Sequence, residues 1–239
     1  MKPPRLPWHT FPDVLIHASE SAVKQHPDYQ AAKTGSAVAA ARLLGDTVND
    51  RQVDALRMLL APHQPILVSA HAYEREGVNA IPEALADELS QRLGWPVDHG
   101  VVQTNMVAHT GADGFARLAR QAAFDGAVIA GADYVLVDDF VGMGGTLANL
   151  RGFIESRGGH VLAATALTGK PHSSKLSVTD QRLAELRCKH GDELEYWWQQ
   201  RFAHAFDSLT ESEARYLVRT PDIDTVRDRI VAQEQTGDC

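Results

Sequence analysis

The sequence predicts an α/β fold in which a parallel sheet is flanked by helices, with an N-terminal arm and a helical C-terminal region. Short apolar runs, typical of strands buried on both faces, alternate with helical patterns of about ten residues. From residue 170 onward only helical patterns occur. The 239 residues suffice for one such domain with an appended segment. We therefore expect an arm over 1–35, an α/β domain over 36–170 and a helical hood or appendage over 171–239.

The individual elements follow from apolar spacing and from helix-ending residues. Residues 1–35 are rich in Pro, His and aromatic residues without a steady period, so we expect them to drape over the domain. Helices are expected over 36–44, 50–60, 82–94, 115–124 and 146–157, and strands over 66–70, 97–104, 127–130, 135–137 and 160–168. In such sheets, ligands bind at the carboxyl ends of the strands.

The C-terminal region contains two helix starts. Thr210 and Glu213 have the spacing of a capping box, and Thr220-Pro221 opens a further helix. The sequence leaves open whether this region is a hood over the site or a separate appendage for assembly.

Composition narrows the class of protein. Asp and Glu number 31 against 23 Lys and Arg, which gives a net charge of −8. No basic run of five or more occurs, so we expect no nucleic-acid partner, although a locally basic pocket remains compatible. The two cysteines suggest no disulfide framework, and the eleven histidines show no metal-ligand spacing. Without an apolar signal region or a run of membrane-spanning length, a cytoplasmic protein with no membrane partner is expected.

The most informative segment is Tyr134–Leu147, which reads YVLVDDFVGMGGTL. An apolar strand leads into two carboxylates, Asp138 and Asp139, and then into a glycine-rich loop and a helix. Glycines allow the backbone to turn sharply and its N–H groups to approach a ligand. The positive end of the following helix favours an anion at the same place. The combination points to a sugar phosphate, with sugar hydroxyls and a nearby magnesium ion separating the carboxylates from the phosphates.

Other interpretations of this segment are weaker or remain open. A dinucleotide-binding G-x-G-x-x-G starting at Gly142 would need glycine at position 147, where the chain has Leu147. An acidic cluster that only binds a metal does not need glycines before a helix, so it explains this segment less well. An ordinary tight strand–helix turn stays open. No Walker A sequence is present, because Gly169-Lys170 is followed by Pro171.

At these residues the chain resembles the type I phosphoribosyltransferase family. Among the members of that family, the resemblance is greatest to the competence-type and purine-related ones. The family combines a strand, an acidic pair and a Gly/Thr loop that binds phosphoribosyl pyrophosphate. The resemblance implies that Asp138 and Asp139 face the ribose hydroxyls, and through them a Mg²⁺ cofactor. It also implies that the 5′-phosphate is wrapped by Val141, Gly142, Met143, Gly144, Gly145 and Thr146. The family usually has hydroxyl residues where this chain has Gly142 and Met143. Replacing both with Thr is therefore expected to tighten phosphate binding.

The resemblance assigns further roles outside the signature. Arg75 and Gly77, in the loop after strand 66–70, would hold the pyrophosphate, although a solvated Glu-Arg-Glu turn is an equal alternative. Arg117 would supply a cation from a mobile loop, with Arg120 and His109 as further candidates. Lys170 would meet the acceptor. These roles follow from matching positions in the family.

Together these features predict a phosphoribosyltransferase that moves ribose 5-phosphate from phosphoribosyl pyrophosphate to a small nitrogenous acceptor and releases pyrophosphate. The alternative is a non-catalytic regulator or sensor that binds the donor or a nucleotide, and a hydrolase or phosphorylase is a weaker third option. The resemblance also implies a homodimer.

Overall fold

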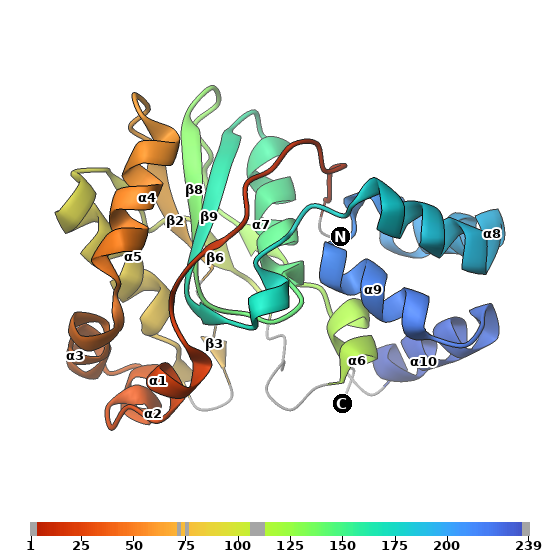
Figure 1. The fold of residues 1–239 in the computed structure, drawn as a ribbon, viewed down its shortest axis with the longest axis horizontal. Helices are drawn as coiled ribbons and strands as arrows, with labels where there is room; N and C mark the ends of the chain where they lie inside the picture. The colour runs from red at the N-terminus through yellow and green to blue at the C-terminus, as the bar shows by residue number, and fades with distance from the viewer. Residues whose placement is uncertain (1–3, 71–72, 75–76, 106–112, 236–239) are drawn as a thin grey trace.

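The computed structural model describes residues 4–70, 73–74, 77–105 and 113–235. Its centre is a five-stranded sheet of order β1-β9-β8-β2-β5, in which every neighbouring pair is parallel (Figure 1). The strands are β1 (Leu15–Ala18), β2 (Ile66–Ser69), β5 (Val97–Asp98), β8 (Asp133–Val141) and β9 (His160–Gly169). The predicted α/β fold with a parallel, helix-flanked sheet is confirmed.

The order of the strands reverses between β2 and β8. From β2 the chain passes outward to β5 at one edge, whereas from β8 it passes in the other direction to β9. A topological switch point therefore lies between the carboxyl ends of β2 and β8. Open α/β sheets bind their ligands at such a point.

Helices cover both faces of the sheet because successive strand residues point to opposite sides. Val135 and Val137 pack into a hydrophobic cluster with α3, α4 and α5. Tyr134 and Leu136 pack into a second cluster with α7 on the other face. The helices of these layers are α3 (Ala37–Thr47), α4 (Asp50–Leu60), α5 (Ile81–Leu93) and α7 (Gly145–Glu155).

The C-terminal helices and α6 (Gly114–Ala119) share a hydrophobic core, which includes Trp198 and Phe206. Figure 1 shows this group beside α7, on the side away from α3, α4 and α5. It consists of α6 (Gly114–Ala119), α8 (Asp180–Phe202), η2 (Phe206–Ser208), α9 (Glu211–Arg219) and α10 (Ile223–Gln235). The predicted capping box is confirmed, since Thr210 N donates to the Glu213 carboxylate at 2.9 Å and Glu213 N donates to Thr210 Oγ1 at 3.1 Å. Within the described part of the chain, no helix combines the length and apolarity needed to cross a membrane.

Residues 1–35 are more than an arm. Leu15–Ala18 forms β1, which pairs with β9 at the edge of the central sheet. Two short helices follow, α1 (Glu20–Lys24) and α2 (Tyr29–Lys33). The sequence signal for this strand is weak because the apolar run Val14–Ile16 is only three residues long and is followed by His17.

Several predicted elements between β2 and α7 differ from the structure. The strand expected over 97–104 is divided between β5 and β6 (Val102–Gln103), which belong to different sheets. The strand expected over 127–130 is absent, and β7 (Phe124–Asp125) pairs with β6 instead. The helix expected over 115–124 ends at Ala119. The remaining short elements are β3 (Tyr73–Glu74), β4 (Gly77–Val78) and η1 (Pro171–Ser173).

Candidate functional site

The glycine-bearing turn connects β8 to α7. Strand β8 continues through both carboxylates to Val141, four residues beyond the predicted end at 137, and α7 begins at Gly145. Gly144, the N-cap of α7, has φ +83°, a backbone conformation that favours glycine. A Cβ at this position would also lie 2.5 Å from the Leu176 side chain. The sharp strand-to-helix connection therefore depends on this glycine.

A cavity of about 270 Å³ opens where β8 and β9 end. It gathers four residues that the sequence singles out, namely Arg117, Gly142, Met143 and Lys170. The other lining residues are Gly114, His172, Ser212, Arg215, Tyr216 and Arg219. Since four of the ten come from α9, the C-terminal region forms one wall of the cavity.

The cavity is strongly basic although the chain as a whole is acidic. Three arginines and one lysine line it, and none of its ten lining residues is acidic. Burial and the neighbouring Arg219 lower the pKa of Arg215. The pKa of His172 is lowered by burial and by the charges of Arg215, Lys170 and Arg219. Like charges held this close favour an anionic ligand that offsets their repulsion.

Arg117 lies against the glycine turn. A Cβ built on Gly142 would be 2.4 Å from Arg117 Nη1, so the guanidinium fills the space that a side chain at position 142 would take. Burial lowers the pKa of Arg117, but the guanidinium remains charged near neutral pH. Gly142 thus allows a cation to approach the turn backbone.

Hydroxyl groups from the C-terminal region fix the orientation of the turn. Ser173 Oγ donates to the carbonyl of Gly142, and Thr210 Oγ1 donates to the carbonyl of Met143 at 2.6 Å. In a trans peptide the N–H and C=O point in opposite directions. The N–H groups that follow these two carbonyls are therefore directed away from the bonded hydroxyls.

The start of α7 is packed against a buried ion pair. Arg5 Nη1 donates to Glu213 Oε2 at 2.7 Å, and both side chains are 2% exposed. Glu213 Oε1 lies 2.7 Å from a Cβ built on Gly145, so the carboxylate closely approaches the first turn of the helix. A carboxylate is favourable at this end of the helix dipole. Thr146, Gly145 and Gly144 do not line the cavity, and Val141 is buried in the apolar core.

The acidic pair lies beside a lysine and an asparagine. Lys33 Nζ, from α2, is 3.0 Å from Asp139 Oδ2, and Asn79 Nδ2 donates to the same oxygen at 2.9 Å. Asp139 N donates to Asp138 Oδ1 at 2.8 Å. Asn79 follows β4 and brings the segment after β2 to the carboxyl end of β8. These contacts lie at the switch point, but neither carboxylate lines the basic cavity.

The two carboxylates have pKa values shifted in opposite directions. Burial and the neighbouring Asp139 raise the pKa of Asp138 well above its usual value. Burial opposes ionisation of Asp139 as well, yet the Lys33 ammonium and the Asn79 amide lower its pKa overall. The pair therefore holds its negative charge on Asp139. Buried groups with pKa values moved apart in this way are common at functional sites.

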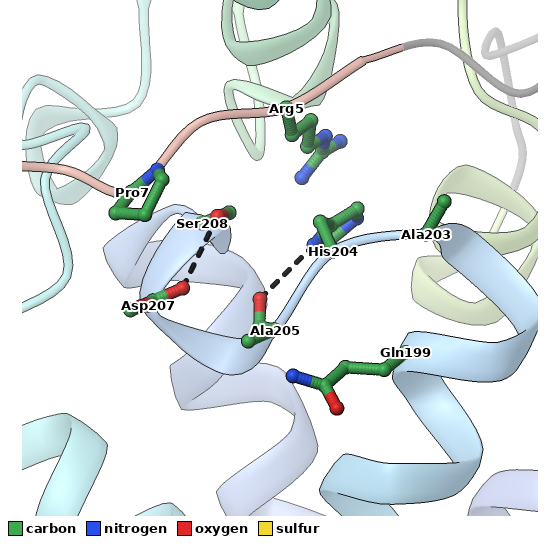
Figure 2. Close-up of a pocket in the computed structure, with 8 residues that line it drawn as sticks. All are labelled: Arg5, Pro7, Gln199, Ala203, His204, Ala205, Asp207 and Ser208. Carbon is green, nitrogen blue, oxygen red and sulfur yellow. Dashed lines mark hydrogen bonds between the residues drawn. The ribbon is translucent and has the colours of Figure 1, made fainter.

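A larger cavity, of about 360 Å³, shares no lining residue with the basic cavity (Figure 2). It is bounded by the N-terminal segment and by the end of α8, and Arg5, Gln199, His204 and Asp207 are among its lining residues. No residue that the sequence analysis selects lines it. The polar chemistry of the switch point therefore belongs to the smaller cavity and the acidic pair.

The remaining predicted residues are distributed as follows. Arg75 and His109 lie outside the described residues. Gly77 begins β4 and pairs with Glu74. Arg120 is the C-cap of α6 and does not line the basic cavity.

Several polar residues of the site, besides Ser212 and Tyr216 of the cavity lining, are not predicted from the sequence. They are Lys33, Asn79, His172, Arg215 and Arg219. A usable signal exists for the last two, because a spacing of four residues places both arginines on one side of a helix. Lys33 and Asn79 have no local signal, since only the fold brings them to Asp139.

The chain is similar in sequence to proteins of two bacteria. Protein TraN of Escherichia coli is 40% identical over 228 residues, which cover 95% of this chain and 51% of TraN. An uncharacterised protein of Haemophilus influenzae is 42% identical over 144 residues, which cover 60% of this chain and 32% of that protein. The chain thus spans about half or less of the length of these relatives. No protein-family model matches the sequence.

Solved structures with partial similarity include phosphoribosyltransferases. An adenine phosphoribosyltransferase aligns with 63% of this chain and 75% of its own, at 13% identity and a TM-score of 0.36. A purine phosphoribosyltransferase from Pyrococcus horikoshii aligns with 52% of this chain and 76% of its own, at 18% identity and a TM-score of 0.34. An orotate phosphoribosyltransferase from Mycobacterium tuberculosis aligns with 57% and 76%, at 17% identity and a TM-score of 0.30. All three TM-scores lie below 0.5.

Proposed function

We propose that the chain binds phosphoribosyl pyrophosphate at the switch point and transfers its ribose 5-phosphate to a nitrogenous acceptor. The observation that carries this proposal is the basic cavity at the Gly142 turn, beside a strand end that presents one buried and one partly buried carboxylate. A polyanionic sugar phosphate has both properties that these surroundings require. Its phosphates need cations, and its sugar hydroxyls need acceptors.

Each group of the donor has a proposed partner. The 5′-phosphate would lie at the turn, against Arg117 and the backbone N–H groups. The ribose hydroxyls would donate to the acidic pair, since Lys33 and Asn79 keep Asp139 in its ionised, acceptor form. The pyrophosphate would meet the segment that contains Arg75 and Gly77. Lys170 would face the acceptor.

The proposed reaction breaks the bond between C1′ and a pyrophosphate oxygen, and the electron pair leaves with the pyrophosphate. A lone pair on the acceptor nitrogen forms the new bond to C1′, and that nitrogen then loses a proton. Positive charge develops on the sugar while the bond to pyrophosphate breaks and the bond to the acceptor nitrogen forms. Placing an ionised carboxylate near this charge, and holding both reactants in place, would lower the barrier.

Magnesium fits the proposal as an ion carried with the donor. Mg²⁺ usually takes one or two protein carboxylates together with substrate oxygens, and Asp138 and Asp139 offer such ligands. The described residues contain no group of three or more His, Cys, Asp or Glu that would hold the ion by protein contacts alone. When bound, magnesium would neutralise charge on the pyrophosphate.

The first prediction concerns the acidic pair. Replacing both residues, Asp138→Asn with Asp139→Asn, is expected to weaken binding of phosphoribosyl pyrophosphate with magnesium by a hundred-fold or more, on the order expected for a preorganised electrostatic contact. Calorimetric titration of wild type and variant measures this change. The control is Asp125→Asn with Asp133→Asn, which removes two carboxylates outside the site.

The outcomes separate the alternatives. Equal donor affinity in the Asp138/Asp139 variant and in wild type would exclude the proposed site. Donor binding without pyrophosphate release, across a panel of nitrogenous bases, would leave the non-catalytic sensor as the function. Pyrophosphate release that needs no acceptor would indicate a hydrolase.

A further inference from the structure

The basic side chains of the cavity form two groups. Arg117 lies at the Gly142 turn, with Nη1 2.4 Å from where a Cβ would be. Lys170, His172, Arg215 and Arg219 come from the segment after β9 and from α9. The charges of Lys170, Arg215 and Arg219 all act on His172, and Arg219 acts on Arg215. The members of the second group therefore act on one another electrostatically, and they lie on the C-terminal wall.

The number of cations exceeds what one phosphate requires. A phosphate monoester carries a charge of about −1.5 to −2 near pH 7. Arg117 and the turn N–H groups already supply donors for one such group. Lys170, Arg215 and Arg219 would then remain together in a cavity of about 270 Å³ without an acidic lining residue. Such a concentration of positive charge favours a second anion.

We propose that Lys170, Arg215 and Arg219, with His172, form a second anion position that binds a phosphate or carboxylate group of the acceptor. The inference rests on the proposed transfer reaction for the identity of the ligand, but the anion position itself does not require it. The acceptor would be a small nitrogenous molecule carrying an anionic group rather than a neutral base.

The geometry of α9 suits this role. Arg215 and Arg219 are separated by one helical turn and lie on the side that faces the cavity. Arg215 Nη2 is 3.2 Å from Ser212 Oγ, which anchors its guanidinium beside another lining residue. Planar guanidinium groups match the paired oxygens of carboxylates and phosphates. Tyr216, between the two arginines, brings a phenol to the same wall, and its ring would touch any Cβ at Gly114.

The test fills the two positions separately. Ribose 5-phosphate is the probe for the turn and inorganic phosphate is the probe for the α9 position. Phosphate is titrated calorimetrically into protein saturated with ribose 5-phosphate. The variants are Arg215→Gln with Arg219→Gln, and Arg117→Gln. Arg51→Gln with Arg57→Gln on α4 is the control, because it makes the same change in net charge at exposed residues on the other face of the sheet.

We expect phosphate to bind in the presence of saturating ribose 5-phosphate. The Arg215/Arg219 variant should weaken this event at least tenfold and leave the affinity for ribose 5-phosphate within twofold of wild type. Arg117→Gln should weaken the binding of ribose 5-phosphate at least tenfold and leave the affinity for phosphate within twofold of wild type. The proposal is overturned if ribose 5-phosphate abolishes phosphate binding, if wild type binds no phosphate, or if the α9 variant behaves like the α4 control.

The same experiment separates this inference from the proposed function. Failure of ribose 5-phosphate to bind would count against the transferase, while phosphate binding that depends on α9 would still establish the anion position. Pyrophosphate serves as a third probe. If pyrophosphate, rather than phosphate, binds to wild type and depends on both Arg117 and the α9 arginines, a single diphosphate position replaces the proposed pair.

Discussion

Gly142 shows how one missing side chain creates room for a distant one. By resemblance alone, the absence of a hydroxyl at this position looks like a lost phosphate donor. The structure places the Arg117 guanidinium in that space. A cation contributes more to phosphate binding than a hydroxyl does. The glycine is therefore a condition for the cation's position, and the structure changes the expected effect of adding a hydroxyl.

Gly142→Thr is accordingly predicted to weaken binding of ribose 5-phosphate about tenfold, because Cβ displaces the guanidinium and hydrogen bonds to charged groups contribute roughly 1.5–3 kcal/mol. Thermal stability should change little, since the displaced atoms are the end of a flexible side chain. Calorimetry and thermal unfolding measure the two effects. In a double-mutant cycle with Arg117→Gln the losses should not add. Tighter binding by Gly142→Thr would show that the hydroxyl, and not Arg117, matters at the turn.

His17 is a neutral histidine built into the sheet edge. Its Nδ1 accepts from Asn49 N at 3.3 Å and its Nε2 is 3.1 Å from Thr165 Oγ1, which itself donates to the Leu15 carbonyl. These bonds require a proton on Nε2 and none on Nδ1. Burial, together with the charge of Arg92, lowers the pKa of His17 to about 4. A second proton would break the bond to the N-cap of α4.

The consequence is a loss of stability in mild acid. Between pH 6.5 and about 4 the unfolded chain binds a proton at His17 that the folded chain does not bind. The free energy of unfolding therefore falls as the pH is lowered through this window, by up to about 3 kcal/mol from this residue. Urea unfolding at pH 7 and pH 4.5 should show a smaller pH dependence for His17→Gln than for wild type. An unchanged pH dependence would mean that His17 is not neutral in the folded protein.

At the level of elements, α7 connects three parts of the molecule. One side packs on the sheet, its first turn meets Glu213 of α9, and its Gly152 lies under the N-terminal segment. A Cβ at Gly152 would be 2.0 Å from the carbonyl oxygen of Pro4. The Arg151 guanidinium also donates to the Leu6 carbonyl at 3.2 Å. The N-terminal segment can therefore follow α7 closely only because the helix has no side chain there.

Gly152→Ala should destabilise the protein by about 1–3 kcal/mol, the typical cost of overpacking, since a backbone atom must move. Gly45→Ala provides the matched control. Gly45 is inside α3 with nothing within 4 Å of its Cβ position, so alanine should stabilise by roughly 0.5–1 kcal/mol. Chemical unfolding measures both. Equal and stabilising effects would show that the N-terminal segment does not rest on α7 in solution.

The predictability of an element depended on whether its signal was local. The strand at 135–137 and α7 were evident because an uninterrupted apolar run met glycines and a helical period. Strand β1 was missed, since its pairing with β9 joins Leu15 to Thr165 and depends on the distant strand. The single strand predicted over 97–104 is wrong because the two-residue strands β5 and β6 leave almost no period to detect. The apolar run at 127–130 forms no strand although its composition favours one. The Lys33–Asp139 contact depends on this unpredicted N-terminal segment.

At the level of the whole molecule, the predicted hood contributes to the basic cavity through α9. The sequence does not distinguish a hood from a separate appendage. An amphipathic pattern predicts that one face of a helix is buried, but it does not predict which surface covers that face. The structure supplies that surface in Thr210 and Ser173, which bond the carbonyls of the glycine turn. The homodimer expected from the family resemblance, the Mg²⁺ cofactor and the acceptor remain predictions.

The edge position of β1 also bears on how the protein is made. A ribosome synthesises Leu15–Ala18 before His160–Gly169, which forms β9, the strand that pairs with β1 in the described part of the chain. At about 5–20 residues per second, on the order of ten seconds passes between the two. During that interval the backbone N–H and C=O groups of Leu15–Ala18 lack the hydrogen bonds that β9 later provides. Completion of the sheet, and with it the approach of Lys33 to Asp139, therefore has to wait until β9 has been synthesised.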